Sequence, residues 1–420
     1  MSDAVVNSVF DLPEFKMYRA RWQKRQKLLT NRLSYYDGSV YKKHKLGWLR
    51  PVLSQEIRPL YLPLSRAVDV DAGIVPAAWA FAEDAPPAWT EARNTLFNMS
   101  KWNTEGVLYS HYGAQQGTSA IKIVDLRQAN PARVMIKPVN PACLLLIPSG
   151  QYDGTPAIAI WVEQRYNDQG AMGEYAEIMT PDHIRTFYDG QPVKIDGREA
   201  EYTNELGFVP YVEVPHINVG REVGDSTYER VMPLLDEVNE MASDLAKVIK
   251  QHAEPQWATF GVQPSELVKS GDNVWMFSNP NSKATPLVAG INIAGVLEFV
   301  REIRDQVRGG LPELSFDELR QQQQIATATL ELQLMELVIK VKRCRPNYDD
   351  GLIQAMRLAG RAAASMGIKE VASLDNDDLT LDNERQVLPL DKETAMRLEM
   401  QAIVLERERE LDNRSEGVNA

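Results

Sequence analysis

The stretch GDSTYERVMPLLDEVNEMASDLAKVIKQHAEP, at residues 224–255, decides how this chain is organised. Apolar residues recur every three or four positions between Val231 and Ile249, which predicts one long amphipathic helix over 227–252. At ~1.5 Å per residue, such a helix is about 36 Å long. Its apolar stripe requires a partner, so we expect a second element to pack along it.

Both ends of this helix carry recognisable signals. Ser226 and Glu229 have the spacing of a capping box, in which each side chain satisfies the other residue's free backbone N–H. Pro255 follows the last apolar turn and cannot continue the helix. These signals predict a helix that begins near residue 227 and ends before Pro255.

A second amphipathic helix is predicted over 293–308, ending at Gly309 and Gly310, a pair typical of a helix end or hinge. Between the two helices, residues 256–288 read as short strands and turns too small to bury a core of their own. Their aromatic residues form a small core, an interface surface, or both: Trp257, Phe260, Trp275 and Phe277. A helical pair with a strand-rich tip spans a distance and presents a docking surface, rather than enclosing a substrate.

The loop over 309–324 contains a glutamine run and few charges, namely Arg308, Glu313 and Arg320. A glutamine run is typical of a neutral, solvated helix face. If this loop instead faces a polyanion, its contacts are weak and non-directional, whereas several Lys or Arg contacts to phosphates bind tightly. A surface past which a polyanion slides should avoid such contacts.

Residues 325–343 predict another helix with two apolar stripes, which implies burial on both sides. Such a helix fits between neighbours in a ring, although a core helix of a monomer would show the same pattern. Pro346 should break or kink it. A helix over 348–366 and a charged helix over about 392–412 are expected to complete the chain.

The first half of the chain combines helices with a strand-rich region. A helix over 14–35 should stop at Asp37-Gly38, and a second is expected over 88–112. From about residue 118 the apolar period changes to two, and turn signals separate the segments, so hairpins are expected. The predicted strands are 120–124, 133–136, 157–162, 175–179 and 184–188. This half therefore reads as an α+β platform.

Charge is unevenly distributed along the 420 residues, which carry a formal net charge of −12. Residues 1–50 hold 11 Lys/Arg against four Asp/Glu, whereas residues 346–420 hold nine against 16. The basic N-terminal helix either touches nucleic acid, touches an acidic neighbour, or is simply a solvated face; its cations include Arg21, Lys24, Arg25 and Lys27. A sequence-reading DNA-binding domain would show a basic pI and a reading motif, and this chain shows neither.

Enzyme signatures are missing from the sequence. Lys269-Ser270 lacks the preceding glycine of a phosphate-binding loop, and neither a His-Glu-x-x-His nor a Gly-x-Ser-x-Gly motif occurs. The acidic pairs Asp349-Asp350 and Asp377-Asp378 lack the regular oxygen-ligand spacing of a cation site. We therefore expect no catalytic residues, no metal site and no cofactor; a nuclease or peptidase is the least favoured class.

The cysteine content indicates a protein made in a reducing compartment, and the hydropathy indicates a protein outside the membrane. Cys143 and Cys344 are too few for a disulfide framework and too far apart for a zinc knuckle. The first residues lack the features of a signal peptide, and the longest apolar runs are too short to span a bilayer. We expect assembly in the cytoplasm and no membrane association.

Four motifs, in their order along the chain, resemble the portal proteins of tailed double-stranded DNA phages, of the siphophage type. They are Tyr35-Tyr36-Asp37-Gly38; Gly224-Asp225-Ser226 leading through Pro233 to Asn239 and ending at His252-Ala253-Glu254-Pro255; the loop at 309–324 before Thr327-Ala328-Thr329-Leu330; and Leu388 to Glu393. The resemblance extends over nearly the whole chain.

This resemblance implies an α+β, mainly helical subunit of a ring, commonly of twelve copies, at one capsid vertex of the virion. It implies a β-rich wing at 1–220, stem helices at 221–254 and 291–308, and a clip at 255–290. A tunnel loop and tunnel helix would occupy 309–345, and a helical crown 346–420.

The resemblance also implies roles for individual residues and for partners. The tunnel loop would face double-stranded DNA, without sequence specificity, through Gly309, Gly310, Leu311, Pro312, Glu313, Leu314, Arg320, Gln321, Gln322, Gln323 and Gln324. The clip aromatics Trp257, Phe260, Trp275 and Phe277 would lie at partner or subunit interfaces. Implied partners are further copies of the chain, the large terminase subunit, a head-completion or adaptor protein, and the major capsid and scaffolding proteins. The alternative is another phage ring component, a head-completion or scaffold-binding protein without a DNA channel.

Overall fold

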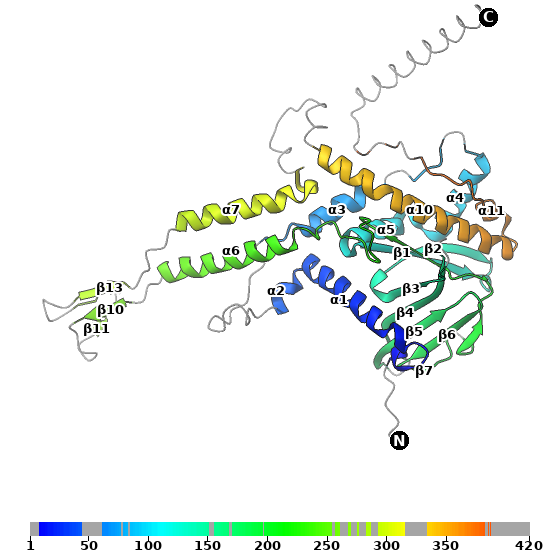
Figure 1. Ribbon diagram of the computed structural model, residues 1–420, viewed down its shortest axis with the longest axis horizontal. Coiled ribbons are helices and arrows are strands. Elements are labelled where there is room, and N and C mark those ends of the chain that lie inside the picture. Colours follow the sequence, from blue (N-terminus) through cyan, green and yellow to red (C-terminus); the bar gives the residue numbers. More distant parts are fainter. Residues whose placement is uncertain are drawn as a thin grey trace, which may run out of the picture.

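The computed structural model describes residues 8–43, 61–315 and 334–387, with gaps at 77–78, 83–84, 151–154, 168–169, 196, 254–256, 261–267, 270–274, 277–282, 287–292, 383–384 and 386. A body of sheets and helices carries a long two-helix arm that projects to one side (Figure 1). Helices and antiparallel sheets both contribute extensively. The expected α+β class is therefore confirmed.

The elements follow one another from the N-terminal segment through the sheets to the arm and then to α10. The helices are α1 (Arg19–Tyr36), α2 (Ser39–Lys43), α3 (Leu64–Ile74), α4 (Pro87–Ser100), α5 (Trp102–Gln116), α6 (Met232–Ala253), α7 (Ile293–Gly309), α10 (Met335–Ser365) and α11 (Lys369–Ala372), with short 3-10 turns η1 (Val9–Asp11), η2 (Lys16–Tyr18), η3 (Pro141–Cys143) and η5 (Pro312–Ser315). The strands are β1 (Thr118–Leu126), β2 (Arg133–Val139), β3 (Leu144–Pro148), β4 (Pro156–Tyr166), β5 (Met172–Met179), β6 (His183–Tyr188), β7 (Gln191–Pro192), β8 (Glu201–Thr203), β9 (Tyr211–Pro215), β10 (Trp257–Phe260), β11 (Val268–Lys269), β12 (Trp275–Met276) and β13 (Lys283–Pro286).

Two antiparallel sheets form the body. One has the order β2-β1-β9; in the other, β3-β4-β5-β6-β7 are neighbours and β8 pairs with β6. Alternation along β1 shows how they are layered: Ile121 and Ile123 join a core with α5 and α10, whereas Ala120 packs toward β4 and β5. The far face of the larger sheet is covered by the N-terminal segment, including Phe10. All five strands predicted by the period-two pattern are present.

The helix expected over 14–35 is present as α1, but it begins at Arg19, after the 3-10 turn η2. It ends at Asp37, and Gly38 follows with φ of +70°, a conformation that glycine adopts without steric cost. Arg32 anchors this helix, because its buried guanidinium donates to the carbonyl oxygens of Gln116 (2.5 Å) and Gly224 (2.9 Å). The basic helix is thereby fixed against the segment that leads into α6.

One helix was predicted over 88–112, and the structure has two. Lys101, between α4 and α5, adopts φ of +54° and serves as the C-cap of the first helix and the N-cap of the second. A left-handed residue cannot continue an α-helix, so the chain changes direction there. The apolar period alone does not reveal this interruption, because both helices pack into the same core.

The arm consists of α6, α7 and the tip strands β10 to β13 (Figure 1). Leu235 and Val238 of α6 share a buried cluster with Ile303 and Val307 of α7, so the start of one helix packs against the end of the other. The two helices are therefore antiparallel, as their apolar stripes predicted. At its far end the tip contains two small antiparallel ribbons, β10-β13 and β11-β12.

The predicted start of the arm's first helix was wrong. Residues before Met232 form turns, and α6 begins at Met232 with Pro233 in its first turn, a position that tolerates the missing N–H. The Ser226 hydroxyl donates to the Glu229 carboxylate at 3.1 Å, instead of accepting from the backbone N–H of Glu229. The pair thus links two side chains in a turn and does not cap the helix.

Pro346 was predicted to break or kink the helix. The predicted break was wrong, because α10 runs through Pro346 without interruption; the predicted kink stays a prediction. Proline removes the hydrogen bond to the carbonyl four residues earlier, which belongs to Lys342. Both Pro346 and Lys342 are exposed, so water can solvate the freed carbonyl. The other face of the helix is held by buried Cys344 and Tyr348.

Several predictions lie outside the described residues. They concern the glutamine run with Arg320, most of the predicted helix before residue 334, Phe277 and the final helix over 392–412. They stay predictions.

Candidate functional site

Exposed apolar side chains mark the arm as a contact surface. Ile249 on α6, Phe260 at the tip, and Leu297 and Phe299 on α7 are large apolar residues with substantial exposure. The inward stripe of the arm is already used, because Ile303 and Val307 are buried against α6. A helical hairpin with apolar residues on its outside favours association with another chain.

The first turns of α10 also have one apolar face buried and another exposed, and the exposed residues are more accessible than those of α7. Of the two apolar stripes predicted there, one is buried within the chain through Leu337 and Val341, whereas Met335 and Ile339 are 54% and 60% exposed. The sequence pattern did not distinguish a helix between ring neighbours from a core helix of a monomer. Within the described part of the chain only one stripe is covered, and the other is exposed.

The described residues of the predicted DNA-facing loop differ in their exposure. Gly309 and Gly310 are exposed, and Pro312 is half-buried. Leu311, Glu313 and Leu314 are buried within the subunit, where η5 packs beside α3 and α7. Their side chains therefore face the subunit interior. A DNA-facing role stays a prediction for the exposed glycines and for residues 320–324, which lie outside the described part.

The predicted clip aromatics lie partly in the tip ribbons. Trp257 and Phe260 belong to β10, which pairs with β13, and Trp275 belongs to β12, which pairs with β11. Phe260 is exposed at the end of its strand. β10 and β13 come from opposite ends of the tip segment and lie side by side. An interface role for these aromatic residues stays a prediction.

A buried set of polar side chains lies where the arm joins the body. This polar junction consists of Asp71 on α3, His216 after β9, Thr227 before α6, Glu313 on η5, and Lys340 and Tyr348 on α10. Asp71, His216 and Glu313 have no exposed surface. Burying charged groups is costly unless they are paired, so their geometry determines whether this joint is stable.

Hydrogen bonds in the polar junction form a chain in which each group donates to the next, from Tyr348 to Asp71. The Tyr348 hydroxyl donates to His216 Nδ1 at 2.8 Å, and His216 Nε2 donates to Thr227 Oγ1 at 3.0 Å. The Thr227 hydroxyl then donates to Asp71 Oδ2 at 2.5 Å. This order requires a neutral histidine with its proton on Nε2 and an ionised Asp71.

Lys340 supplies the positive charge at the end of this chain of hydrogen bonds. Its ammonium lies 3.5 Å from Asp71 Oδ2, donates to the Thr227 carbonyl at 3.3 Å, and donates to Glu313 Oε1. The second oxygen of each carboxylate, Asp71 Oδ1 and Glu313 Oε2, is buried without a hydrogen-bond partner. One cation therefore serves two buried carboxylates, which favours protonation of one of them.

The pKa shifts agree with this assignment. Burial, together with the nearby charge of Asp71, raises the pKa of Glu313 to about 8. Burial opposes ionisation of Asp71 as well, but Lys340 and the hydrogen bonds of His216 and Thr227 hold its pKa below the ordinary value. Burial lowers the pKa of His216, despite Asp71 beside it. At neutral pH the junction holds charged Asp71 and Lys340, with Glu313 mostly protonated.

Sequence reasoning did not identify the polar junction. Its signal was present as single charged residues inside apolar helical runs, Asp71 in one and Lys340 in the other. Such residues are rarely buried unless they are paired. Asp71 is 156 residues from Thr227, and Lys340 is 113 residues from Thr227 and 27 from Glu313. The sequence pattern does not match residues at such separations. His216 lies outside both helical runs, after β9, and is buried.

No group of three or more His, Cys, Asp or Glu that could hold a metal occurs among the described residues. Over the same ranges, none of the helices is both long and apolar enough to cross a membrane. Cys143 and Cys344 are free thiols.

Replacing Glu313 with glutamine should change the pH dependence of stability. Because the folded-state pKa is about 8 and the ordinary value is 4.5, the folded chain holds a proton between these values that the unfolded chain releases. This carboxyl therefore lowers the free energy of unfolding as pH rises through that window. The pKa values of Asp71 and His216 are lowered by folding, so these two groups raise the free energy of unfolding as pH rises.

The difference in free energy of unfolding between Glu313→Gln and the unchanged chain isolates this group. We expect the variant to become relatively more stable from pH 5 to pH 8, measured by urea denaturation at each pH. Glu336→Gln, at an exposed position of α10, is the matched control and should give a flat difference. A flat difference for Glu313→Gln as well would show that its carboxyl is ionised throughout.

Comparison with known proteins gives a match over the centre of the chain. Residues 106–308, from α5 to α7, match the family described as phage portal protein, SPP1 Gp6-like. No curated protein sequence matches the chain.

Two solved structures resemble the fold. One is described as the virion of a native gene transfer agent (GTA) particle; it has 12% identity and a TM-score of 0.38, and the likeness covers 82% of this chain and 85% of that chain. The other is described as the neck of a native GTA particle computed with C12 symmetry, with 12% identity, a TM-score of 0.37, and coverage of 81% and 85%. At these TM-scores neither likeness carries an argument about function. The family match carries more weight: residues 106–308 of this chain match the SPP1 Gp6-like family of phage portal proteins, which confirms the resemblance indicated by the sequence motifs.

Proposed function

We propose that this chain is the subunit of a portal ring, the oligomer at one capsid vertex through which double-stranded DNA is packaged and released. The observation that carries the proposal is the family match over residues 106–308, which contains the sheets of the body and the complete arm. We propose a structural, non-enzymatic role in the virion, with no cofactor.

Exposed apolar surface supports ring formation. The uncovered stripe of α10 at Met335 and Ile339, and the outer face of the arm at Leu297 and Phe299, lie on different elements of one subunit. Different patches on one chain favour a head-to-tail interface, and such interfaces close into a ring when the rotation between copies allows it. We propose a ring of twelve copies.

The proposed parts follow the resemblance. Residues 1–220 would form the wing, 221–254 and 291–308 the stem, and 255–290 the clip that docks the large terminase subunit and later a head-completion protein. Residues 309–345 would form the tunnel loop and helix, and 346–420 the crown; the last boundary falls within α10. Capsid and scaffolding proteins would contact the outside of the ring.

Electron microscopy of the purified chain, with mass photometry, tests the proposal. We expect closed rings with a central hole wide enough for duplex DNA. As a matched pair, Ile339→Asp should abolish rings, because it places a charge in the proposed apolar interface, whereas Lys342→Asp on a neighbouring exposed face should retain them. A compact particle without a channel would contradict the portal proposal and favour a head-completion or scaffold-binding protein.

A further inference from the structure

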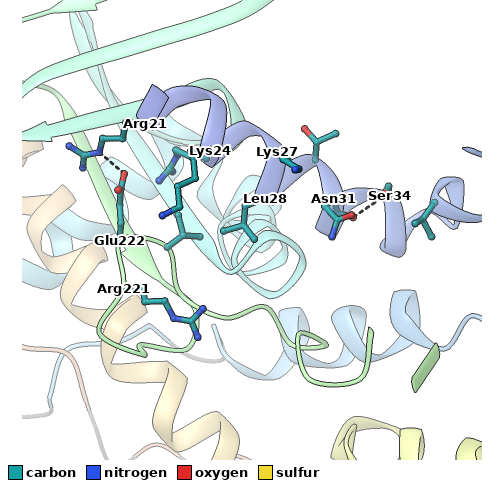
Figure 2. Close-up of a pocket in the computed structure, with 12 residues that line it drawn as sticks. Arg21, Lys24, Lys27, Leu28, Asn31, Ser34, Arg221 and Glu222 are labelled. Atoms are coloured by element: carbon teal, nitrogen blue, oxygen red, sulfur yellow. Dashed lines mark hydrogen bonds and ion pairs between the residues drawn. The ribbon is translucent and has the colours of Figure 1, made fainter. Parts of the chain in front are cut away.

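A groove runs along the basic N-terminal helix (Figure 2). This α1 groove has a volume of about 1040 Å³ and lies between α1 and the loop before Gly224, with lining residues that include Arg21, Lys24, Lys27, Leu28, Arg221 and Val223. Leu28 is half-buried, and Val223 and Val40 are buried at its base. The groove thus combines an apolar floor with a cationic rim.

The charges on the rim are only partly neutralised within the chain. Helix α1 contains six Lys or Arg residues and no Asp or Glu. Arg21 pairs with Glu222 at 2.8 Å, and the guanidinium of Arg25 is buried against Glu213. Lys24 and Lys27 are exposed and have no ion pair among the described residues. These two lysines are available to an acidic partner.

The shape of the groove matches a helix. Its lining on α1 runs from Arg21 to Ser34, which is about 20 Å along the helix axis. An apolar floor with charged edges is the arrangement in which an amphipathic helix binds. Duplex DNA, in contrast, is held by many cations and offers no apolar face to such a floor.

The outer face of α7 has the complementary chemistry. Glu298 and Glu302 are exposed there beside the exposed Arg301, and Phe299 is exposed on the same side as Glu302. Asp305 is exposed as well but pairs with Arg304 at 3.0 Å, so Glu298 and Glu302 are the carboxylates that remain for a partner. With 17 residues, α7 is about 25 Å long, slightly longer than the groove. Its inward face is occupied by α6 through Ile303 and Val307, so the acidic face is free to contact another copy.

We propose that the α1 groove of one subunit receives the acidic outer face of α7 from the neighbouring subunit. This inference rests on the proposed ring and identifies one contact between adjacent copies. Lys24 and Lys27 pair with Glu298 and Glu302, and Phe299 covers the apolar floor near Leu28. The contact ties the arm of one subunit to the basic helix of the next.

Charge reversal tests this contact. Variant one carries Lys24→Glu and Lys27→Glu, variant two carries Glu298→Lys and Glu302→Lys, and variant three carries all four changes. We expect each of the first two to lower the fraction of rings about tenfold or more, since like charges across an interface are strongly unfavourable. Variant three should restore most of the loss, and added salt should weaken the unchanged rings.

Arg133→Glu with Lys369→Glu is the matched control, because it changes the net charge as variant one does, at exposed positions on β2 and α11. Rings should persist in it. Unchanged rings in variant one, or no restoration in variant three, would overturn the proposal. Intact rings in variant one that no longer bind a 20-base-pair DNA duplex would also overturn it and assign the groove to nucleic acid.

Cross-linking separates this proposal from the ring itself. Lys27→Cys with Glu302→Cys, in a Cys143→Ser background, should give a covalent link between copies with a short bismaleimide, whether or not the oligomer closes. Rings without this link would overturn the α1–α7 contact while leaving the portal proposal intact. A link without rings would support the contact and contradict the portal proposal.

Discussion

Lys340→Met should lower the free energy of unfolding by about 3 kcal/mol, because it removes the only cation of the polar junction and leaves a buried carboxylate uncompensated. Asp71 has no exposed surface, and its remaining partners, Thr227 and a neutral His216, supply hydrogen bonds but no charge. Denaturation of the full chain in urea, followed by tryptophan fluorescence at low protein concentration, measures the effect.

The control is Lys342→Met, two positions along the same helix and exposed. An exposed substitution of this kind changes stability by about 0.5 kcal/mol or less. Adding Asp71→Asn to Lys340→Met should recover part of the loss, because the buried charge is then removed with its partner. If the double variant is as unstable as Lys340→Met alone, lost packing and not lost charge explains the effect.

Gly113→Ala is expected to destabilise the chain by about 3 kcal/mol, because the helices α5 and α10 are in contact at this position. An added Cβ would overlap the hydroxyl of Tyr348 and lie 2.8 Å from its ring carbon Cζ. Tyr348 cannot easily move away, since it is fully buried and its hydroxyl donates to His216. The thermal unfolding midpoint and urea denaturation report the loss.

A second helical glycine provides the opposite control. Gly73 lies in α3, and nothing is within 4 Å of a Cβ added there. Gly73→Ala should therefore stabilise the chain by about 0.5–1 kcal/mol, as alanine does in an exposed helix. Combining Gly113→Ala with Tyr348→Phe should recover part of the loss, since the overlapping oxygen is removed. Equal effects of the two glycine substitutions would show that helix propensity, not the α5–α10 contact, controls both sites.

Long-range ion pairs explain why the candidate site was only partly predictable. The exposed stripe at Met335 and Ile339 was visible as a second apolar periodicity, because helical spacing is a local property. The polar junction was not visible, because Asp71, His216, Glu313 and Lys340 are brought together by the packing of four separate segments. Glu313 illustrates the consequence: its sequence context indicated a DNA-facing loop, whereas its side chain is buried beside Lys340.

The sequence by itself determined the α+β class, the two arm helices, all five predicted strands and the order of motifs that indicated the portal family. These features depend on apolar period and turn chemistry, which are local. Only the tertiary structure decided that Lys101 divides one predicted helix into two, that α10 continues through Pro346, and that Ser226 and Glu229 lie in a turn. At Pro346, burial of the face that includes Cys344 and Tyr348 outweighs the local preference of one residue. At Lys101 and Ser226 the chain changes direction to meet its packing partners. In each case the energy depends on residues distant in the chain, which a local pattern does not contain.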